Sequence, residues 1–333
     1  MSNNRLIVVV GATGLQGRGV VTQLLADNSA TWTVRALTRN THSARSKDLL
    51  SQLQTSDNRL SLAEAHVHDP ASLDAAFAGA HGVFGMTTNQ KEPGTLLLTE
   101  EDVKHEIEAG QNMVDAVVRN RVAHFVFSSL PDVIKGSGGK FTGALNMNNK
   151  VEIERIARRE VDGFTAVVPG NFFSNLSWPM YTRAQPDGSV RFCDPIGADK
   201  ETQWLDGERD IGAFVARIFA LGVEKTKNKS YIAGGKLLSV NEMIETFTRV
   251  TGRKAYYDPI TYEQFADQAA AVMGPAFRNC VLEMKQWAGE TPAGKINYGC
   301  SNPEEDISAE LGVAVTGLEE WICSTGFVGP ELA

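Results

Sequence analysis

Short runs of apolar residues alternate along the chain with longer segments in which apolar residues recur at helical spacing. The runs predict strands at residues 5–10, 32–38, 59–66, 82–86, 123–128 and 163–169. The amphipathic segments predict helices at 15–27, 43–54, 71–78, 100–120 and 147–160. Strict alternation of this kind is typical of a parallel sheet with helices on both faces. We therefore expect a doubly wound α/β fold of the Rossmann type, with its ligand site at the carboxyl ends of the strands.

The pattern changes after residue 170. A helix is predicted at 208–222, a strand at 229–233, and helices at 239–251 and 261–288. We expect residues 1–170 to form the nucleotide-binding domain and residues 171–333 a smaller α/β lobe, with a chain that could cross back between them. Large apolar side chains of this lobe could line a pocket or simply form its core; they are Phe172, Phe173, Trp178, Met180, Tyr181, Trp204, Met273 and Phe277.

Three glycines follow the first strand, at Gly11, Gly14 and Gly17, and the first helix begins among them. A glycine in such a turn adopts backbone angles that other residues avoid, a second lets the backbone approach a diphosphate, and a third lets the helix pack on the strand. Free N–H groups and the helix dipole then favour an anion. The context of strand, turn and helix predicts a dinucleotide site, whereas the alternative is a βα turn without a ligand.

The second strand ends at Thr38-Arg39, where the adenine ribose of a dinucleotide is expected. No Asp or Glu occurs between Asn28 and Lys47, and Arg35 and Arg45 flank the strand end. A guanidinium suits a 2′-phosphate, whereas a carboxylate would suit the 2′-hydroxyl of NAD. The sequence therefore predicts NADP(H), and the alternative is a solvated basic loop.

The third strand closes with His66, His68 and Asp69. Two histidines on one strand face could bind a metal ion, but no third ligand is evident nearby, so we expect no metal site. We expect Asp69 instead to cap the next helix and to lie near the adenine.

Hydroxyl side chains follow the fourth and fifth strands, at Thr87, Thr88, Ser128 and Ser129. They are candidate contacts to the nicotinamide half of the cofactor or to a substrate, or else ordinary turn residues. Lys150 opens the next predicted helix and could hold the nicotinamide ribose and move a proton. The alternative is a surface lysine that pairs with Glu154, one helical turn further on.

Composition narrows the remaining classes of function. The 333 residues carry a net charge of −8, with 42% hydrophobic and 22% charged residues, which is ordinary for a globular protein and makes nucleic-acid binding unlikely. A local basic patch at Arg155, Arg158 and Arg159 is the one exception that we consider. Four cysteines without C-x-x-C pairing indicate reduced thiols, and no apolar run is long enough to cross a membrane. We expect a cytoplasmic protein, with the nucleus as a second location.

Several segments together resemble the NmrA-like family, a group of atypical short-chain dehydrogenases. The matching segments are Gly11-Ala-Thr-Gly-Leu-Gln-Gly17, Thr38-Arg39, Ser128-Ser-Leu-Pro-Asp132, Lys150-Val-Glu152, Pro169-Gly-Asn-Phe-Phe-Ser-Asn175 and Trp204-Leu-Asp-Gly-Glu-Arg-Asp-Ile-Gly212. The resemblance implies a Rossmann lobe, a smaller α/β lobe and NADP(H) binding. It adds Thr13, Gln16, Pro169, Asn171 and Phe172 to the expected cofactor contacts, and it assigns catalysis to Lys150 and Ser129.

The resemblance also leaves two functions open. Active short-chain dehydrogenases use a Tyr-x-x-x-Lys pair in which the tyrosine donates a proton, but the residue four positions before Lys150 is Asn146, which cannot supply one at neutral pH. One family precedent is a reductase in which the lysine carries the acid–base work on a small, largely apolar substrate. The other is a regulator without turnover that senses the NADPH/NADP ratio and acts through a partner protein.

Overall fold

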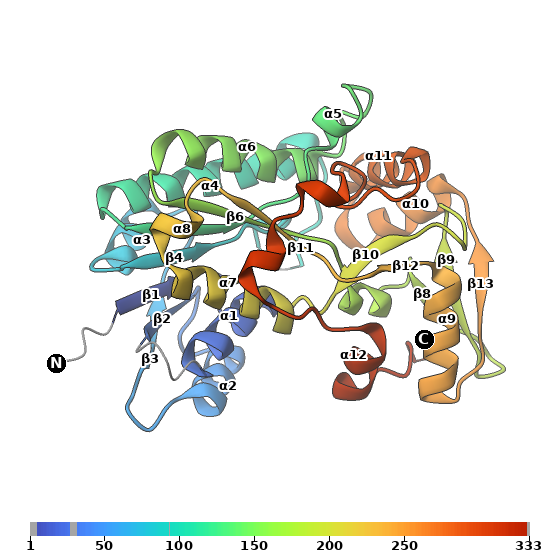
Figure 1. Ribbon diagram of the computed structural model, residues 1–333, viewed down its shortest axis with the longest axis horizontal. Coiled ribbons are helices and arrows are strands. Elements are labelled where there is room, and N and C mark those ends of the chain that lie inside the picture. The colour runs from blue at the N-terminus through green and yellow to red at the C-terminus, as the bar shows by residue number, and fades with distance from the viewer. Residues whose placement is uncertain (1–4, 27–31, 93, 332–333) are drawn as a thin grey trace.

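The computed structural model describes residues 5–26, 32–92 and 94–331. Its main element is a seven-stranded sheet in the order β11-β6-β5-β4-β1-β2-β3, in which all neighbouring strands are parallel (Figure 1). The strands are β1 (Arg5–Val9), β2 (Trp32–Thr38), β3 (Leu60–Glu64), β4 (Gly82–Gly85), β5 (His124–Ser128), β6 (Phe164–Pro169) and β11 (Ser230–Ala233). The predicted strands of this sheet are confirmed, with small differences at their ends.

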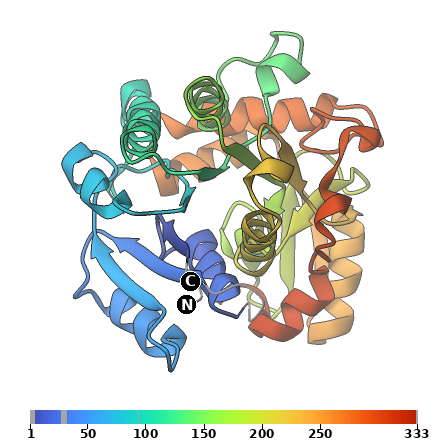
Figure 2. The same cartoon turned by 60° about the vertical axis from the view of Figure 1, so that its left-hand side comes forward.

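Helices cover both faces of this sheet (Figure 2). One face packs against α1 (Leu15–Ala26), α2 (Ala44–Leu53) and α7 (Arg209–Leu221), and the other against α3 (Pro70–Phe77), α4 (Glu100–Arg119) and α6 (Leu145–Glu160). Residues of β1 and the residue that follows it alternate between the two cores, with Ile7 and Val9 in one and Val8 and Val10 in the other. The chain therefore forms the doubly wound fold that the sequence predicts.

The strand order reverses at β1, whose neighbours are β2 on one side and β4 on the other. In open parallel sheets, the crevice beyond the carboxyl ends of two such strands is where ligands bind. The turns that follow β1 and β4 are therefore the first place to look for a site.

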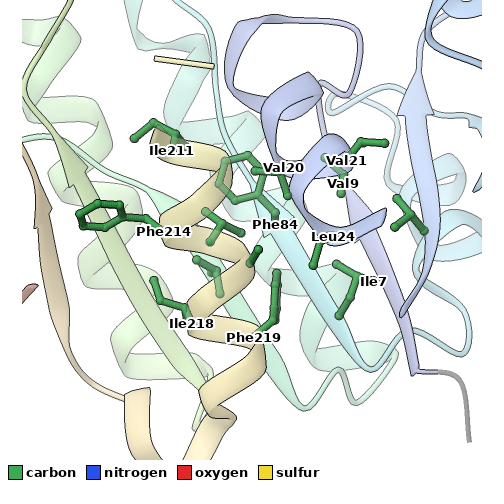
Figure 3. Close-up of a cluster of buried hydrophobic side chains, with 14 of the residues drawn as sticks. Ile7, Val9, Val20, Val21, Leu24, Phe84, Ile211, Phe214, Ile218 and Phe219 are labelled. Carbon is green, nitrogen blue, oxygen red and sulfur yellow. The ribbon is translucent and has the colours of Figure 1, made fainter. Parts of the chain in front are cut away.

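The backbones of α1 and α7 are in direct contact at two glycines. A Cβ atom on Gly19 would overlap the carbonyl oxygen of Glu208, and one on Gly212 would overlap the carbonyl oxygen of Gly19. Figure 3 shows the apolar side chains around this contact. They are Val20, Val21 and Leu24 of α1, Ile211, Phe214, Ile218 and Phe219 of α7, and Ile7, Val9 and Phe84 of the sheet. The chain beyond residue 205 thus returns to the large sheet through α7 and β11.

The smaller lobe contains two three-stranded sheets with the orders β12-β10-β7 and β13-β9-β8. Their strands are β7 (Asn171–Phe172), β8 (Thr182–Ala184), β9 (Val190–Asp194), β10 (Thr202–Leu205), β12 (Leu237–Leu238) and β13 (Ala255–Pro259). The lobe's helices are α9 (Val240–Thr251), α10 (Tyr262–Met273), α11 (Phe277–Glu290) and α12 (Leu318–Thr325). Shorter helical turns are α5 (Val133–Gly136), α8 (Val223–Thr226), η1 (Phe173–Ser177), η2 (Pro303–Glu305) and η3 (Ser308–Leu311).

The structure corrects the prediction of a single helix at 261–288. Gly274 takes a φ of 109° and Pro275 follows it, so the chain breaks there into α10 and α11. The break admits the backbone of Leu97, whose N–H donates to the carbonyl of Met273 at 2.8 Å. The short strands of residues 171–205 were also not predicted. Within the described part of the chain, no helix combines the length and apolar character that a membrane span requires.

Candidate functional site

The glycine turn between β1 and α1 has the geometry of an anion site. Gly11 adopts a φ of 67°, and its carbonyl accepts the N–H of Gly14 at 2.9 Å. A Cβ on Gly17 would overlap the backbone of Gly11, whereas one on Gly14 would meet only the Gly11 carbonyl, at 3.3 Å. The first turn of α1 holds no acidic residue, and no described residue accepts from the N–H of Leu15 or Gln16. These unpartnered donors favour a phosphate.

The arginines around the end of β2 have different roles. Arg39 lies at the strand end, and its Nη1 contacts the Glu92 carboxylate at 2.9 Å. Arg35 is turned away, since its Nη1 donates to the carbonyls of Ala76 at 2.7 Å and Ala78 at 3.0 Å. Arg45 is exposed on α2. The structure thus leaves Arg39 and Arg45 on the side where a 2′-phosphate is expected.

Asp69 caps α3, as the sequence predicts, because its carboxylate accepts from the N–H groups of Ala71 at 3.1 Å and Ser72 at 3.3 Å. Beside it, the rings of His68 and His105 are joined by a 3.2 Å hydrogen bond. Burial lowers the pKa of His68, so the neutral ring is favoured there. Across the described residues, no group of three or more His, Cys, Asp or Glu side chains could hold a metal ion.

Lys150, in the first turns of α6, contacts residues from two other elements. Its Nζ donates to Glu106 Oε1 at 2.6 Å and to Thr87, through Oγ1 at 2.9 Å and the carbonyl oxygen at 3.1 Å. The side chain of Lys150 is 13% exposed and that of Glu106 is 0% exposed. The predicted alternative of a surface pair with Glu154 is wrong, because that carboxylate binds Arg158 at 2.7 Å.

Sequence reasoning missed Glu106. The residue lies on the buried face of α4, three positions after Val103 and seven before Met113, both of which are fully buried. A carboxylate within such an apolar stripe is a signal for a buried partner. Its second oxygen, Oε2, has no hydrogen-bond partner among the described residues. Glu106 therefore compensates the charge of Lys150 inside the protein.

The other hydroxyl residues at the strand ends differ in the hydrogen bonds that they make. Ser128 Oγ donates to Gln16 Oε1 at 2.7 Å, which joins the end of β5 to the glycine turn. Ser129 is buried and its hydroxyl makes only a long contact of 3.5 Å with the carbonyl of Leu130. Thr88 is exposed, and its hydroxyl donates to the carbonyl of Gln90 at 2.8 Å. Among these hydroxyls, that of Ser129 therefore makes the weakest hydrogen bond within the protein.

A cavity of about 220 Å³ begins at Ser128, Ser129 and Lys150 and extends into the smaller lobe. Its wall contains several residues expected in the cofactor and catalytic site, namely Gln16, Ser128, Ser129, Lys150, Pro169 and Phe172. Aromatic and apolar side chains close the rest of it, including Trp178, Met180, Tyr181, Phe265, Phe277, Val281 and Met284. Lys150 is the one charged side chain in this wall. The cavity therefore suits a neutral, largely apolar compound.

For three of the large apolar residues that could line a pocket or form the core, the structure decides for the core. Phe173, Trp204 and Met273 pack inside the smaller lobe, where the rings of Phe173 and Trp204 stack with centroids 6.1 Å apart. Their side chains therefore contribute to the packing of the smaller lobe.

Two tyrosines that the sequence did not single out for chemistry also reach the cavity. The hydroxyl of Tyr298 donates to Asn171 Oδ1 at 2.9 Å, and Asn171 itself is not part of the cavity wall. Burial raises the pKa of the Tyr181 and Tyr298 phenols, so both are neutral hydrogen-bond donors. Asn146 lines the cavity where active short-chain dehydrogenases have their tyrosine, and its buried Oδ1 has no partner among the described residues.

The basic patch on α6 is neutralised by neighbouring carboxylates. Arg155 pairs with Asp132 at 2.7 Å, Arg158 with Glu154, and Arg159 with Glu160 at 2.7 Å. Each of the three arginines therefore has a carboxylate partner.

Comparison with known proteins identifies the family. The model of the NmrA-like family matches residues 3–322, so the chain belongs to that family. Two relatives are NmrA-like family domain-containing oxidoreductases. Hkm9 of Aspergillus hancockii is 30% identical over 79% of this chain and 78% of its own, and FrzB of a Cladobotryum species is 29% identical over 77% and 76%.

Solved structures have the same fold. NmrA, a negative transcriptional regulator crystallised with NADP, superposes with a TM-score of 0.71 at 21% identity over 96% of this chain and 94% of its own. The NADPH-dependent quinone oxidoreductase QOR2 of Escherichia coli, crystallised with NADPH, gives 0.70 at 19% identity over 96% and 100%.

Proposed function

We propose that this protein binds NADP(H) and is an NADPH-dependent oxidoreductase that acts on a small, largely apolar substrate. The observation that carries the proposal is the cavity that runs from Lys150 and Ser129 into the aromatic interior of the smaller lobe. One end lies at the strand ends where a Rossmann fold presents its nicotinamide, and the other provides apolar walls for a second molecule.

The residues around the crevice fit the phosphorylated dinucleotide. The turn from Gly11 to Gly17, with Thr13 and Gln16, would hold the diphosphate, and Arg39 the 2′-phosphate. Asp69 lies on the adenine side. The nicotinamide half would meet residues at the ends of β4, β5 and β6, in the short strand β7 and in α6, namely Thr87, Thr88, Ser128, Lys150, Pro169, Asn171 and Phe172. The solved relatives with NADP and NADPH support this assignment.

The cofactor supplies a hydride when it is bound, and the protein's own residues must supply position and a proton. Lys150 holds the nicotinamide ribose and delivers a proton, directly or through water, to the oxygen or carbon of the product. All three of its N–H groups have acceptors in Thr87 and Glu106. Lys150 must therefore give up one of these bonds when it turns an N–H toward a ligand. Ser129 donates a second hydrogen bond to the substrate.

Replacement of the lysine tests this function. With menadione as a flat, neutral probe, the wild type should oxidise NADPH, and Lys150→Ala should abolish turnover while part of the NADPH affinity survives. Lys104→Ala removes an exposed lysine of α4 and is the matched control. Unchanged turnover in Lys150→Ala would reject the catalytic role. Failure of the wild type with quinone, enone and ketone probes alike would reject the reductase.

A second candidate is a regulator that binds NADP(H) without turning over a substrate. Asn146 in place of a proton-donating tyrosine favours it, and so does the full set of internal partners of Lys150. The cofactor would then shift the protein between two surfaces that a partner protein distinguishes. Capture of a partner from cell extract with NADP and with NADPH should differ. Equal capture with both forms of the cofactor would remove this candidate.

A further inference from the structure

Glu92 lies where it can compete with a cofactor phosphate. One carboxylate oxygen of Glu92 contacts Arg39 Nη1 at 2.9 Å, and the other contacts His66 Nε2 at 3.0 Å. The carboxylate therefore joins the end of β2 to the segment that follows β3. These are the two strand ends on the adenosine side of the crevice.

Arg39 binds the Glu92 carboxylate and is also the residue proposed to bind the 2′-phosphate of the cofactor. Arg35 is committed to two carbonyls of α3 and its following turn, so it cannot replace Arg39 without breaking those bonds. A 2′-phosphate binds a guanidinium best through a pair of parallel N–H groups. Glu92 already uses one Nη1 donor of Arg39, so a phosphate in the same place must share the guanidinium with a carboxylate or displace it.

The segment that carries Glu92 also contacts the reacting end of the site. It follows Thr87, which accepts two hydrogen bonds from Lys150, and it leads to Thr99, which caps α4. Within the segment, the Thr95 N–H donates to the Glu92 carbonyl at 3.1 Å. Further along, Leu97 is fixed to the smaller lobe through Met273. Glu92 thus lies between two anchored points of the chain, Thr87 and Leu97.

We propose that Glu92 is an internal competitor of the 2′-phosphate and sets how strongly the protein prefers NADP(H) over NAD(H). This inference rests on the proposed NADP(H) site. A negative carboxylate within about 5 Å of a phosphate that carries nearly two charges weakens its binding by roughly fivefold to tenfold at physiological salt. NAD(H) lacks that phosphate, so its affinity does not depend on this repulsion.

Calorimetry with NADP and NAD on the full chain tests the inference. Glu92→Gln keeps the shape of the side chain and removes its charge. It should tighten NADP binding by roughly fivefold to tenfold and leave NAD binding within about twofold. Glu101→Gln is the matched control, since it removes an exposed carboxylate that pairs with Lys104.

The outcomes separate this inference from the proposed function. If the wild type binds NADP and Glu92→Gln leaves its affinity unchanged or weakens it, Glu92 is not a competitor, while the NADP(H) site stands. An equal gain in affinity for NADP and NAD would also overturn the inference, since the charge of Glu92 would then act on both dinucleotides and not on the 2′-phosphate. If neither the wild type nor Glu92→Gln binds NADP, the cofactor assignment fails and the inference fails with it.

Discussion

Removal of the Lys150 ammonium group should destabilise the whole protein unless the charge of Glu106 is removed as well. The two side chains are joined at 2.6 Å, and Glu106 is fully enclosed, with one oxygen that has no described partner. Lys150→Met leaves a buried carboxylate without a counter-charge. Loss of one member of such a pair costs about 3–5 kcal/mol.

The expected loss of stability is large enough to be measured as a shift in Tm. For a chain of 333 residues, 1 kcal/mol corresponds to a shift of about 1.4 °C in Tm at the usual entropy of unfolding per residue. We therefore expect Lys150→Met to lower Tm by about 4–7 °C in differential scanning calorimetry. The double variant Lys150→Met with Glu106→Gln should recover more than half of this loss, because no charge stays buried.

This pair of variants also separates stability from catalysis. The double variant should fold well and still fail to turn over substrate, since the proton donor is missing. Two results would refute the reasoning. One is a Lys150→Met protein that loses less than about 1 kcal/mol. The other is a double variant that is no more stable than the single one, which would mean that the two charges do not compensate each other.

Three further predictions concern the cofactor turn, cofactor selectivity and pH. Gly17→Ala should weaken NADP binding at least tenfold in a fluorescence titration, because the added methyl group overlaps the backbone of Gly11 and must open the turn; unchanged affinity would contradict the turn geometry. Arg39→Asp should weaken NADP binding roughly thirtyfold and NAD binding far less, since only NADP carries the 2′-phosphate; an unaltered NADP affinity would reject the assignment. Burial lowers the pKa of His124 to about 3, so the unfolded chain takes up a proton below about pH 6.5 and the folded protein does not. The contribution of this residue to the free energy of unfolding is complete above pH 6.5 and falls by about 2 kcal/mol at pH 5. In urea unfolding, His124→Gln should therefore make the free energy of unfolding less dependent on pH between pH 6.5 and 4.

The sequence predicted the large sheet well because its inner strands β4, β5 and β6 are buried along their whole length and are rich in apolar residues. It predicted the smaller lobe less well. Strands such as β8 and β10 are three or four residues long, too short for a period to show. The helix at 261–288 has no gap in its apolar pattern, and only Gly274-Pro275 marked the break that makes room for Leu97.

The candidate site shows the same division. The glycine turn and the position of Lys150 follow from local spacing, and the structure brings Gln16, Ser128 and Lys150 to one cavity. The partner of Lys150 does not follow from local spacing, because Glu106 lies 44 residues earlier and meets it only through the packing of α4 on α6. Apolar composition likewise cannot tell a cavity wall from a core, since both need the same side chains.

The glycine contact between α1 and α7 has a consequence for how the two lobes communicate. The two backbones touch at Gly19 and Gly212, so no side chain lies between them to change rotamer and absorb a shift. The chain enters α7 directly from β10, and β10 pairs with Phe172 in the cavity wall. A tilt of α1 would therefore be transmitted through α7 and β10 to one wall of the cavity, so that a ligand at the glycine turn and a ligand in the cavity would affect each other's binding.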